Sequence, residues 1–583
     1  MATFESPTGT RPDGVNGSFI TAEPVAVAVH LREPARVGTE DRFGPSDPPR
    51  GWDVTVNPGI ARLVRSRRFQ FLLILPCQII FWAVIFVGLL GTAIPGLNFG
   101  TVITWYIWAA LVFVMMLAAG RAWCAMCPFG GLAEWVQRRT FWRRTQRSLG
   151  LGRKFPAPLA RYGFLLPMAT FVALTWIEEF FNIAGPGDPA DTSWLVAGIV
   201  GSALIFFLVF ERRTFCRYLC PLTTLIGSVG SMGPVAGFRA RDREVCLTCQ
   251  TKDCMRGGEN GFGCPWYTWP ASADSNLYCG LCSECYKACP EGNVGLFLQK
   301  PLTSVIAPGR RRADVAWAIA LLWGLVLYQQ INATNRYANV DDWLNSSLHF
   351  PHYPDPVAYA GLIGLLALAT AGGAWGIGKL FARRDLEFTA KGSFLDRGSR
   401  FRAYFLPISY GLIPVVGADY FARMLPKFCH YSPRLIPSVQ RMFGFTPAIH
   451  SPLVTVRMLS DPRIVIAQVA VMALGTLAAL WSVWRIGSRE LVPVSRSAIG
   501  VRVATAGFVL SCGAVAAVLY VLIQAADLTG DDHETDTHVR SAGRGRPAAR
   551  DSPHRPLRGL PGMRHPLPAR GAGDRCQPLG CGG

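Results

Sequence analysis

The cysteines are the residues of this chain whose spacing most clearly indicates chemistry. Residues 279–290 read Cys-Gly-Leu-Cys-Ser-Glu-Cys-Tyr-Lys-Ala-Cys-Pro, which is the pattern C-x2-C-x2-C-x3-C-P. Thiolates so close together can bind three corners of one iron–sulfur cubane, and the cysteine before the proline is then directed to a second cluster. A zinc site usually takes its cysteines as two separated pairs. The spacing therefore predicts [4Fe–4S] clusters rather than zinc.

A second group of cysteines upstream supplies the partner that this run requires. Cys246-Leu-Thr-Cys249 is followed by Cys254 and, after a longer gap, by Cys264-Pro265. In two-cluster ferredoxins the last cysteine of each run binds the cluster of the other run. This rule predicts two [4Fe–4S] clusters, one on Cys279, Cys282, Cys285 and Cys264 and one on Cys246, Cys249, Cys254 and Cys289. Because the last two spacings of the upstream group are longer than in a ferredoxin run, zinc or an empty site remains the alternative for the cluster on Cys246, Cys249, Cys254 and Cys289.

Two further pairs of cysteines lie where apolar segments end. They are Cys124 with Cys127-Pro128, and Cys216 with Cys220-Pro221. The prolines discourage helix continuation, so thiols and free backbone should meet near the membrane surface. The four thiols could form a dithiol relay or a thiolate-bound metal centre, or they could be plain helix-end residues. Nearby cations should lower their pKa values; these are Arg121, Arg213 and Arg217.

Membrane helices must position these cysteines. The chain has 583 residues, of which 50% are hydrophobic and only 16% charged, as is typical of a membrane protein. Apolar segments of about 20 residues can cross a bilayer. About nine are expected, at 69–93, 101–120, 162–183, 194–210, 314–331, 356–381, 403–424, 463–485 and 500–525.

The predicted fold is an all-α multi-pass membrane bundle with an inserted α+β two-cluster ferredoxin-like domain. The bundle should consist of residues 67–236, with four helices, and residues 301–526, with about five. The ferredoxin-like domain should span residues 237–300. Residues 1–66 are polar and rich in Pro and Gly, which predicts a disordered cytoplasmic arm, and residues 527–583 should form a disordered tail.

The charges of the loops predict the orientation. Lys and Arg are concentrated in the loops on the side of the cysteines, whereas the short loops 94–100 and 184–193 have none. The positive-inside rule then places the cysteines in the cytoplasm, where thiols stay reduced. The loop 426–462 is the exception, since it is basic although predicted outside. Topology-setting loops and a basic tail explain the net charge of +20, so no nucleic-acid partner is expected.

Four histidines fall in two loops predicted to lie outside. Imidazoles gathered on one face could bind haem or copper, although ordinary loop residues are the alternative. They are His349, His352, His430 and His450.

Three carboxylates lie in predicted membrane segments. They are Glu178, Glu179 and Asp419. Carboxylates at membrane depth are costly and often functional, and a quinone site needs a proton acceptor. They are candidates for that role, while a water-exposed helix end is the alternative for the two glutamates.

The order of the motifs resembles a known family. Gly120-Arg-Ala-Trp-Cys-Ala-Met-Cys-Pro-Phe-Gly130, the second Cys-Pro motif and the ferredoxin insert resemble NosR/NapH/FixG-type membrane polyferredoxins over roughly residues 68–300. The first motif here is Cys-x2-Cys-Pro instead of the family's Cys-x3-Cys-Pro. No flavin-binding domain is recognisable, and the segments from residue 314 onward match nothing in the family.

The resemblance implies a 4Fe–4S membrane protein of the bacterial inner membrane, with its ferredoxin domain in the cytoplasm. Such a protein would pass electrons between a cytoplasmic or quinol donor and a redox partner protein or respiratory complex. It would form the electron-transfer component of an oxidoreductase system. Two alternatives remain open: an assembly or metal-reducing factor for a respiratory metalloenzyme, and an iron–sulfur redox sensor.

Overall fold

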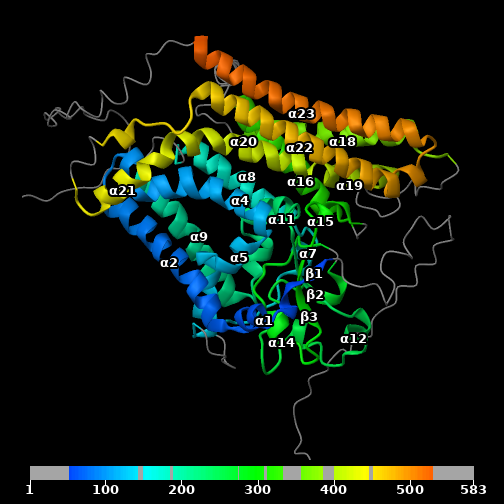
Figure 1. Cartoon of the computed structure of the whole chain (residues 1–583), viewed down its shortest axis with the longest axis horizontal. Coiled ribbons are helices and arrows are strands. Elements are labelled where there is room, and N and C mark those ends of the chain that lie inside the picture. Colours follow the sequence, from blue (N-terminus) through cyan, green and yellow to red (C-terminus); the bar gives the residue numbers. More distant parts are fainter. Residues whose placement is uncertain are drawn as a thin grey trace, which may run out of the picture. The chain divides into compact units, whose positions relative to one another are not determined.

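The computed structural model describes residues 51–141, 149–183, 188–273, 275–307, 311–332, 356–384, 399–445 and 451–529. These residues form mainly helices, together with one small three-stranded sheet (Figure 1).

Within this part of the chain, seven helices are long and apolar enough to cross a membrane. They are α2 (Arg67–Leu90), the run of α3 (Phe99–Thr101), the π-helix η3 (Val102–Trp108) and α4 (Ala109–Ala119), α9 (Pro189–Val209), α16 (Ala313–Asn332), α18 (Pro356–Phe381), α22 (Asp461–Glu490) and α23 (Ala498–Thr529). The chain is therefore a multi-pass helical membrane protein.

The other two predicted spans differ from the expectation. Helix α19 (Arg400–Gly411) is bent by 41° against the helical segment from Ile413 to Met442, so the two form either one broken span, which would be the eighth, or a re-entrant loop. That segment contains α20 (Ile413–Tyr431) and α21 (Leu435–Met442). Helix α8 (Leu165–Phe180) has only 16 residues. At 1.5 Å per residue it is about 24 Å long, too short for a hydrocarbon core of about 30 Å.

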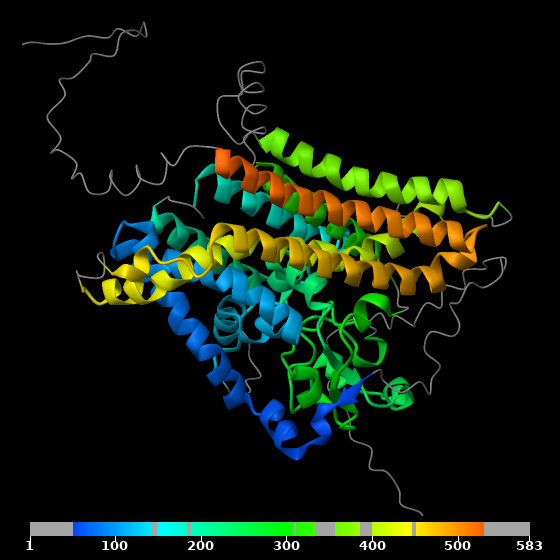
Figure 2. The same ribbon diagram turned by 45° about the horizontal axis from the view of Figure 1, so that its top comes forward.

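The helices pack in two sets that share one apolar core. In the N-terminal set, α2 packs on α9 and on α6 (Pro128–Arg138). In the C-terminal set, α20 packs on α22 and α16 packs on α18. Helix α23 lies beside α18 and α22 in both views (Figure 1, Figure 2). Helices α4, α8 and α20 contribute to the shared core, so the sets form one folded body.

Short helices connect these elements at the end where the cysteines lie. They are α5 (Ala122–Met126), α7 (Ala157–Ala160), α10 (Thr214–Tyr218), α11 (Leu222–Gly230) and α15 (Thr303–Ile306).

A small sheet supports the ferredoxin cysteines. Its strand order is β1 (Trp52–Asp53), β3 (Val294–Leu298) and β2 (Val235–Ala240), with both pairings antiparallel. Three short helices carry or flank the cysteines: α12 (Arg243–Thr248), α13 (Asp253–Arg256) and α14 (Glu284–Ala288).

The N-terminal segment corrects one expectation. Residues 51–66 were predicted to belong to a disordered arm, yet they form β1 and helix α1 (Pro58–Arg65). Asp53 accepts a hydrogen bond from Arg241 of the ferredoxin region at 2.7 Å, and β1 completes the sheet edge. Long-range pairing with β3, more than 240 residues away, cannot be detected in the local composition.

Candidate iron–sulfur site

The structure brings the eight ferredoxin cysteines together in the two groups predicted from the exchange rule. We call Cys246, Cys249, Cys254 and Cys289 the distal group, and Cys264, Cys279, Cys282 and Cys285 the proximal group. The distal group lines one small cavity between α12, α13 and the loop after α14. The chain crosses between the groups where the Cys264 N–H donates to the Cys254 carbonyl at 2.7 Å.

The pKa values of the cysteine thiols reflect how close the cysteines of each group lie to one another. Burial, together with the neighbouring thiols of Cys289, Cys246 and Cys249, raises the pKa of Cys254 to about 12. Burial likewise raises the pKa of Cys285, to which Cys264, Cys282 and Cys279 add. The thiols of Cys254 and Cys285 are therefore neutral near pH 7 without a metal, and binding iron would release their protons.

Hydrogen bonds to sulfur already surround both groups. In the proximal group, the Phe238 N–H donates to Cys279 Sγ at 3.4 Å, and the Thr268 N–H to Cys264 Sγ at 3.3 Å. In the distal group, the Asn293 amide donates to Cys246 Sγ at 3.2 Å. Such bonds help to set the reduction potential of a cluster. The residues present thus fit two iron–sulfur clusters, and their role as ligands stays a prediction.

The four helix-end cysteines also come together, and we call Cys124, Cys127, Cys216 and Cys220 the membrane tetrad. Burial raises the pKa of Cys216, and its three tetrad neighbours raise it further, so all four thiols lie near one another. Helix α5 ends at Met126, Cys127 is extended, and Pro128 begins α6. Cys220 precedes Pro221 and α11 in the same way.

One expectation for the tetrad is confirmed in direction but not in outcome: Arg213 lowers the pKa of Cys127 and Arg121 that of Cys220, yet both pKa values are raised overall. Arg121, Arg213 and Arg217 were expected to lower the thiol pKa values. Burial dominates instead: the pKa rises to about 12 at Cys127 and to about 11 at Cys220, against the opposing effect of the nearby arginines. The cations therefore do not produce free thiolates, although they lie where an anionic centre would need them.

Two arginines are buried between the tetrad and the proximal group, and each is only 1% exposed. Arg213 donates to both carboxylate oxygens of Glu134 at 2.8 Å and to the Cys124 carbonyl at 2.7 Å. Burial opposes ionisation of Glu134, but Arg138 and Arg213 outweigh it and lower the pKa of Glu134 to about 2. The Arg213 charge is thus matched by a carboxylate.

Among the residues that the structure describes, Arg121 has no such carboxylate partner. Its guanidinium stacks on the Trp266 ring at 4.3 Å from the centroid and donates to the Leu277 carbonyl. Within the described residues, its Nε and Nη2 atoms are buried without any hydrogen-bond acceptor. Because a buried unpaired charge is costly, the position of Arg121 fits an anionic group between the tetrad and the proximal group. Thiolate-ligated iron–sulfur clusters are anionic groups of this kind.

Further arginines fix the ferredoxin region against the membrane helices. Arg212 donates to the Cys264 carbonyl and Arg217 to the Trp266 carbonyl, both at 2.7 Å. At the start of α2, Arg67 pairs with buried Glu284 at 3.4 Å. Cys216, Cys264 and Trp266 belong to one buried apolar cluster, against which Cys124 and Cys220 pack. The two cysteine regions therefore touch through packed protein.

The other predicted sites have separate outcomes. His349, His352 and His450 lie outside the described residues. His430 pairs with Asp461 at 2.7 Å at the end of α20. Within the part of the chain that the structure describes, no three His, Cys, Asp or Glu side chains are arranged to hold a single metal ion.

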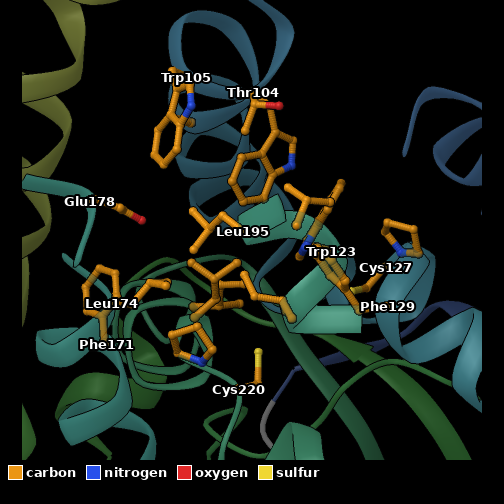
Figure 3. A pocket seen from close by; sticks show the side chains of 18 of the residues that line it. Thr104, Trp105, Trp123, Cys127, Phe129, Phe171, Leu174, Glu178, Leu195 and Cys220 are labelled. Atoms are coloured by element: carbon orange, nitrogen blue, oxygen red, sulfur yellow. The ribbon is translucent and has the colours of Figure 1, made fainter. Parts of the chain in front are cut away.

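A cavity of about 520 Å³ adjoins the tetrad. It lies among α2, η3, α4, α5, α8, α9 and α20, and all four tetrad cysteines line it. In Figure 3 Cys220 and Glu178 point into it from different sides. Glu179 lines it as well, whereas Asp419 is buried elsewhere and accepts hydrogen bonds from Tyr520, at 2.8 Å, and Gln330.

Comparison with known proteins gives one family. Residues 101–150 and 191–236 match the family model of a 4Fe–4S binding domain. No curated protein and no solved structure matches the chain. The matched segments contain all four tetrad cysteines and none of the eight ferredoxin cysteines. Together with the apolar helices, the match fits an iron–sulfur membrane protein.

Sequence reasoning missed several residues of this site. It did not assign roles to Glu134 or Trp266, or to Trp108 and Trp123, which line the cavity. Glu134 lies two turns into α6 and could have been noticed as a carboxylate one turn before Arg138 on the same helix face.

Proposed function

We propose that this protein is a membrane electron-transfer protein with three iron–sulfur centres. Two [4Fe–4S] clusters would lie on the distal and proximal groups, and a third centre, also a cluster, would lie on the membrane tetrad. When bound, a cluster accepts or donates one electron. The chain's own contribution is to hold the three groups in sequence, exclude water and place positive charge between them.

The observation that carries this proposal is the uncompensated charge of Arg121 beside a tetrad that matches a 4Fe–4S binding domain. Its charge acts on a tetrad thiol, Cys220, and on a proximal one, Cys279, and in each case favours the thiolate over the thiol. Arg213 likewise lies between Cys216 and Cys282. The three proposed centres would therefore follow one another from the ferredoxin region toward the membrane, in the order distal group, proximal group and tetrad.

Electrons would pass between a donor, either cytoplasmic or a quinol, and a redox partner protein or respiratory complex. The cavity beside the tetrad favours exchange with a component of the membrane over a role as a sensor or as an assembly or metal-reducing factor. The expected location is the bacterial inner membrane, with the ferredoxin region in the cytoplasm. Reporters fused after Arg147 or Arg397 should then read as cytoplasmic, and one near Asn345 as external.

The iron content of cysteine variants tests the third centre. Anaerobically purified protein should hold about twelve iron and twelve acid-labile sulfide, as three cubanes require. Cys124→Ser and Cys216→Ser should each hold about eight, and both ferredoxin signals should remain in the paramagnetic resonance spectrum of reduced protein. Cys512→Ser, on the distant helix α23, is the control and should keep about twelve. About eight iron in the unchanged protein and in both tetrad variants would show that the tetrad binds no cluster.

A further inference from the structure

The cavity beside the tetrad opens toward the lipid. Two of its lining residues, Ile80 of α2 and Leu111 of α4, are 43% and 49% exposed on the apolar outside of the bundle. The other walls are mostly apolar and aromatic. A volume of about 520 Å³ lies within the usual range of about 300–1,000 Å³ for small-molecule sites. A ligand that enters from the hydrocarbon must itself be lipophilic.

The tetrad end of the cavity offers hydrogen-bond donors without acceptors. Trp108 and Trp123 line it with ring centroids 5.3 Å apart. Within the described residues, the buried indole N–H groups of both have no partner. Buried indoles normally find an acceptor. A planar ligand with carbonyl oxygens would satisfy these donors.

Ionisable groups line another part of the wall. Glu178 and Glu179 of α8 face the same cavity as Arg423 and Lys427 of α20. Arg423 donates to Gln329 of α16, which also lines the cavity. In the described part of the chain, neither the Glu178 carboxylate nor the Lys427 ammonium takes part in an ion pair within 4 Å. Two carboxylates beside two cations suit proton exchange with a neutral head group better than binding of a lipid phosphate.

We propose that this cavity binds a membrane quinone, with its ring beside Trp108 and Trp123 and its tail leaving past Ile80 and Leu111. The inference rests on the proposed function, because the electrons need the tetrad centre. Quinol oxidation would give quinone, two electrons and two protons. The electrons would pass singly to the tetrad centre and on to a redox partner. The protons would go to the Glu178 and Glu179 carboxylates, and quinone reduction would reverse each step.

Binding of decylubiquinone to the detergent-purified, cluster-loaded protein tests the site without relying on turnover. Quenching of tryptophan fluorescence reports binding because Trp108 and Trp123 line the proposed ring position. Ala109→Phe places a ring in the cavity and should weaken binding at least tenfold. Val114→Phe adds the same ring to α4 at a position that is 48% exposed and does not line the cavity, so affinity should stay unchanged.

Trp123→Phe keeps the ring and removes the N–H donor, so it should weaken binding about two- to tenfold, the range of a single hydrogen bond. Glu178→Gln should leave binding intact and slow reduction of the tetrad centre by quinol, while dithionite reduces the centre at the normal rate. The inference is overturned if decylubiquinone does not bind, if Ala109→Phe and Val114→Phe bind alike, or if native mass spectrometry finds a phospholipid that quinone cannot displace.

The two proposals fail separately. Loss of quinone binding with about twelve iron present would overturn only the quinone site. Quinone binding to a protein with about eight iron would overturn the tetrad centre and the electron route, but it would leave the cavity as a quinone-binding site.

Discussion

The ferredoxin cysteines and the membrane tetrad are assembled in opposite ways. The eight ferredoxin cysteines lie between Cys246 and Cys289, on short helices and loops that have little structure of their own. The tetrad joins two pairs that are separated in the chain by α8 and α9. Its geometry depends on packed membrane helices, whereas that of the ferredoxin groups should depend mostly on bound metal.

The two regions also differ in how charge is balanced. The ferredoxin sulfurs accept hydrogen bonds from Phe238, Thr268 and Asn293, and the distal group is partly open to solvent through Cys249 and Cys289. The tetrad is flanked by the buried cations Arg121 and Arg213 with one carboxylate, Glu134. A site whose cysteines are close in sequence therefore needs few supporting residues, whereas a site built by helix packing needs specific buried partners.

The largest effect should come from the Arg213–Glu134 pair, because Arg213 also donates to the backbone carbonyl of Cys124 in the tetrad. Glu134→Gln keeps the shape but leaves Arg213 as a buried, unpaired charge, which should cost about 3–5 kcal/mol of stability. The thermal unfolding midpoint in detergent should fall, and tetrad iron should be lost first. Glu244→Gln, at an exposed site on α12, is the control.

A double variant separates the charge from the packing. Glu134→Leu with Arg213→Met removes both charges and should recover most of the lost stability. If Glu134→Gln unfolds at the same temperature as the unchanged protein, the pair does not support the tetrad.

The second prediction disrupts the ferredoxin groups and leaves the tetrad intact. Cys282→Ala should remove the proximal cluster and destabilise the distal one, because the two share interleaved ligands and the Cys254–Cys264 crossing. The tetrad should keep its share of about four of the twelve iron, and the distal group should keep fewer than about four. Iron and sulfide analysis with paramagnetic resonance measures this. Stoichiometric zinc, with no paramagnetic signal on reduction, would contradict cluster binding in the ferredoxin groups.

These contrasts explain how much could be predicted from sequence. The helical membrane class followed from apolar segments, and the two ferredoxin groups followed from spacing, because both signals are local. The span count did not, because α8 is shorter than its apolar run and α19–α20 is bent near Leu412 and Pro414. Three other features depend on contacts between residues that are distant in sequence. They are the ordered segment 51–66, the burial that raises the pKa values of Cys127, Cys216 and Cys220, and the indole N–H groups that have no partner among the described residues.

The third prediction concerns close packing against a ferredoxin sulfur. Gly237 has φ +91°, and a Cβ there would lie 2.8 Å from Cys279 Sγ. Gly237→Ala should therefore strain the backbone and displace a ligand of the proximal cluster, shortening its lifetime in air. Gly292→Ala is a matched control, since Gly292 has φ +59° but nothing within 4 Å of the added methyl group. Equal lifetimes in both variants would show that backbone strain alone is responsible.

The smallest effect should be a shift of reduction potential at the boundary between the two regions. Reduction adds negative charge, so buried Arg121 stabilises the reduced state of both neighbouring centres. Arg121→Met should lower the potentials of the tetrad and proximal centres, while Arg121→Lys should keep most of the original value. Arg62→Met makes the same charge change at an exposed site on α1 and should have little effect because water screens it. Redox titration followed by paramagnetic resonance measures all three variants. The distal centre should move least, because only the other two lie beside Arg121; a uniform shift of all three would mean that Arg121 acts through general packing and not through its charge.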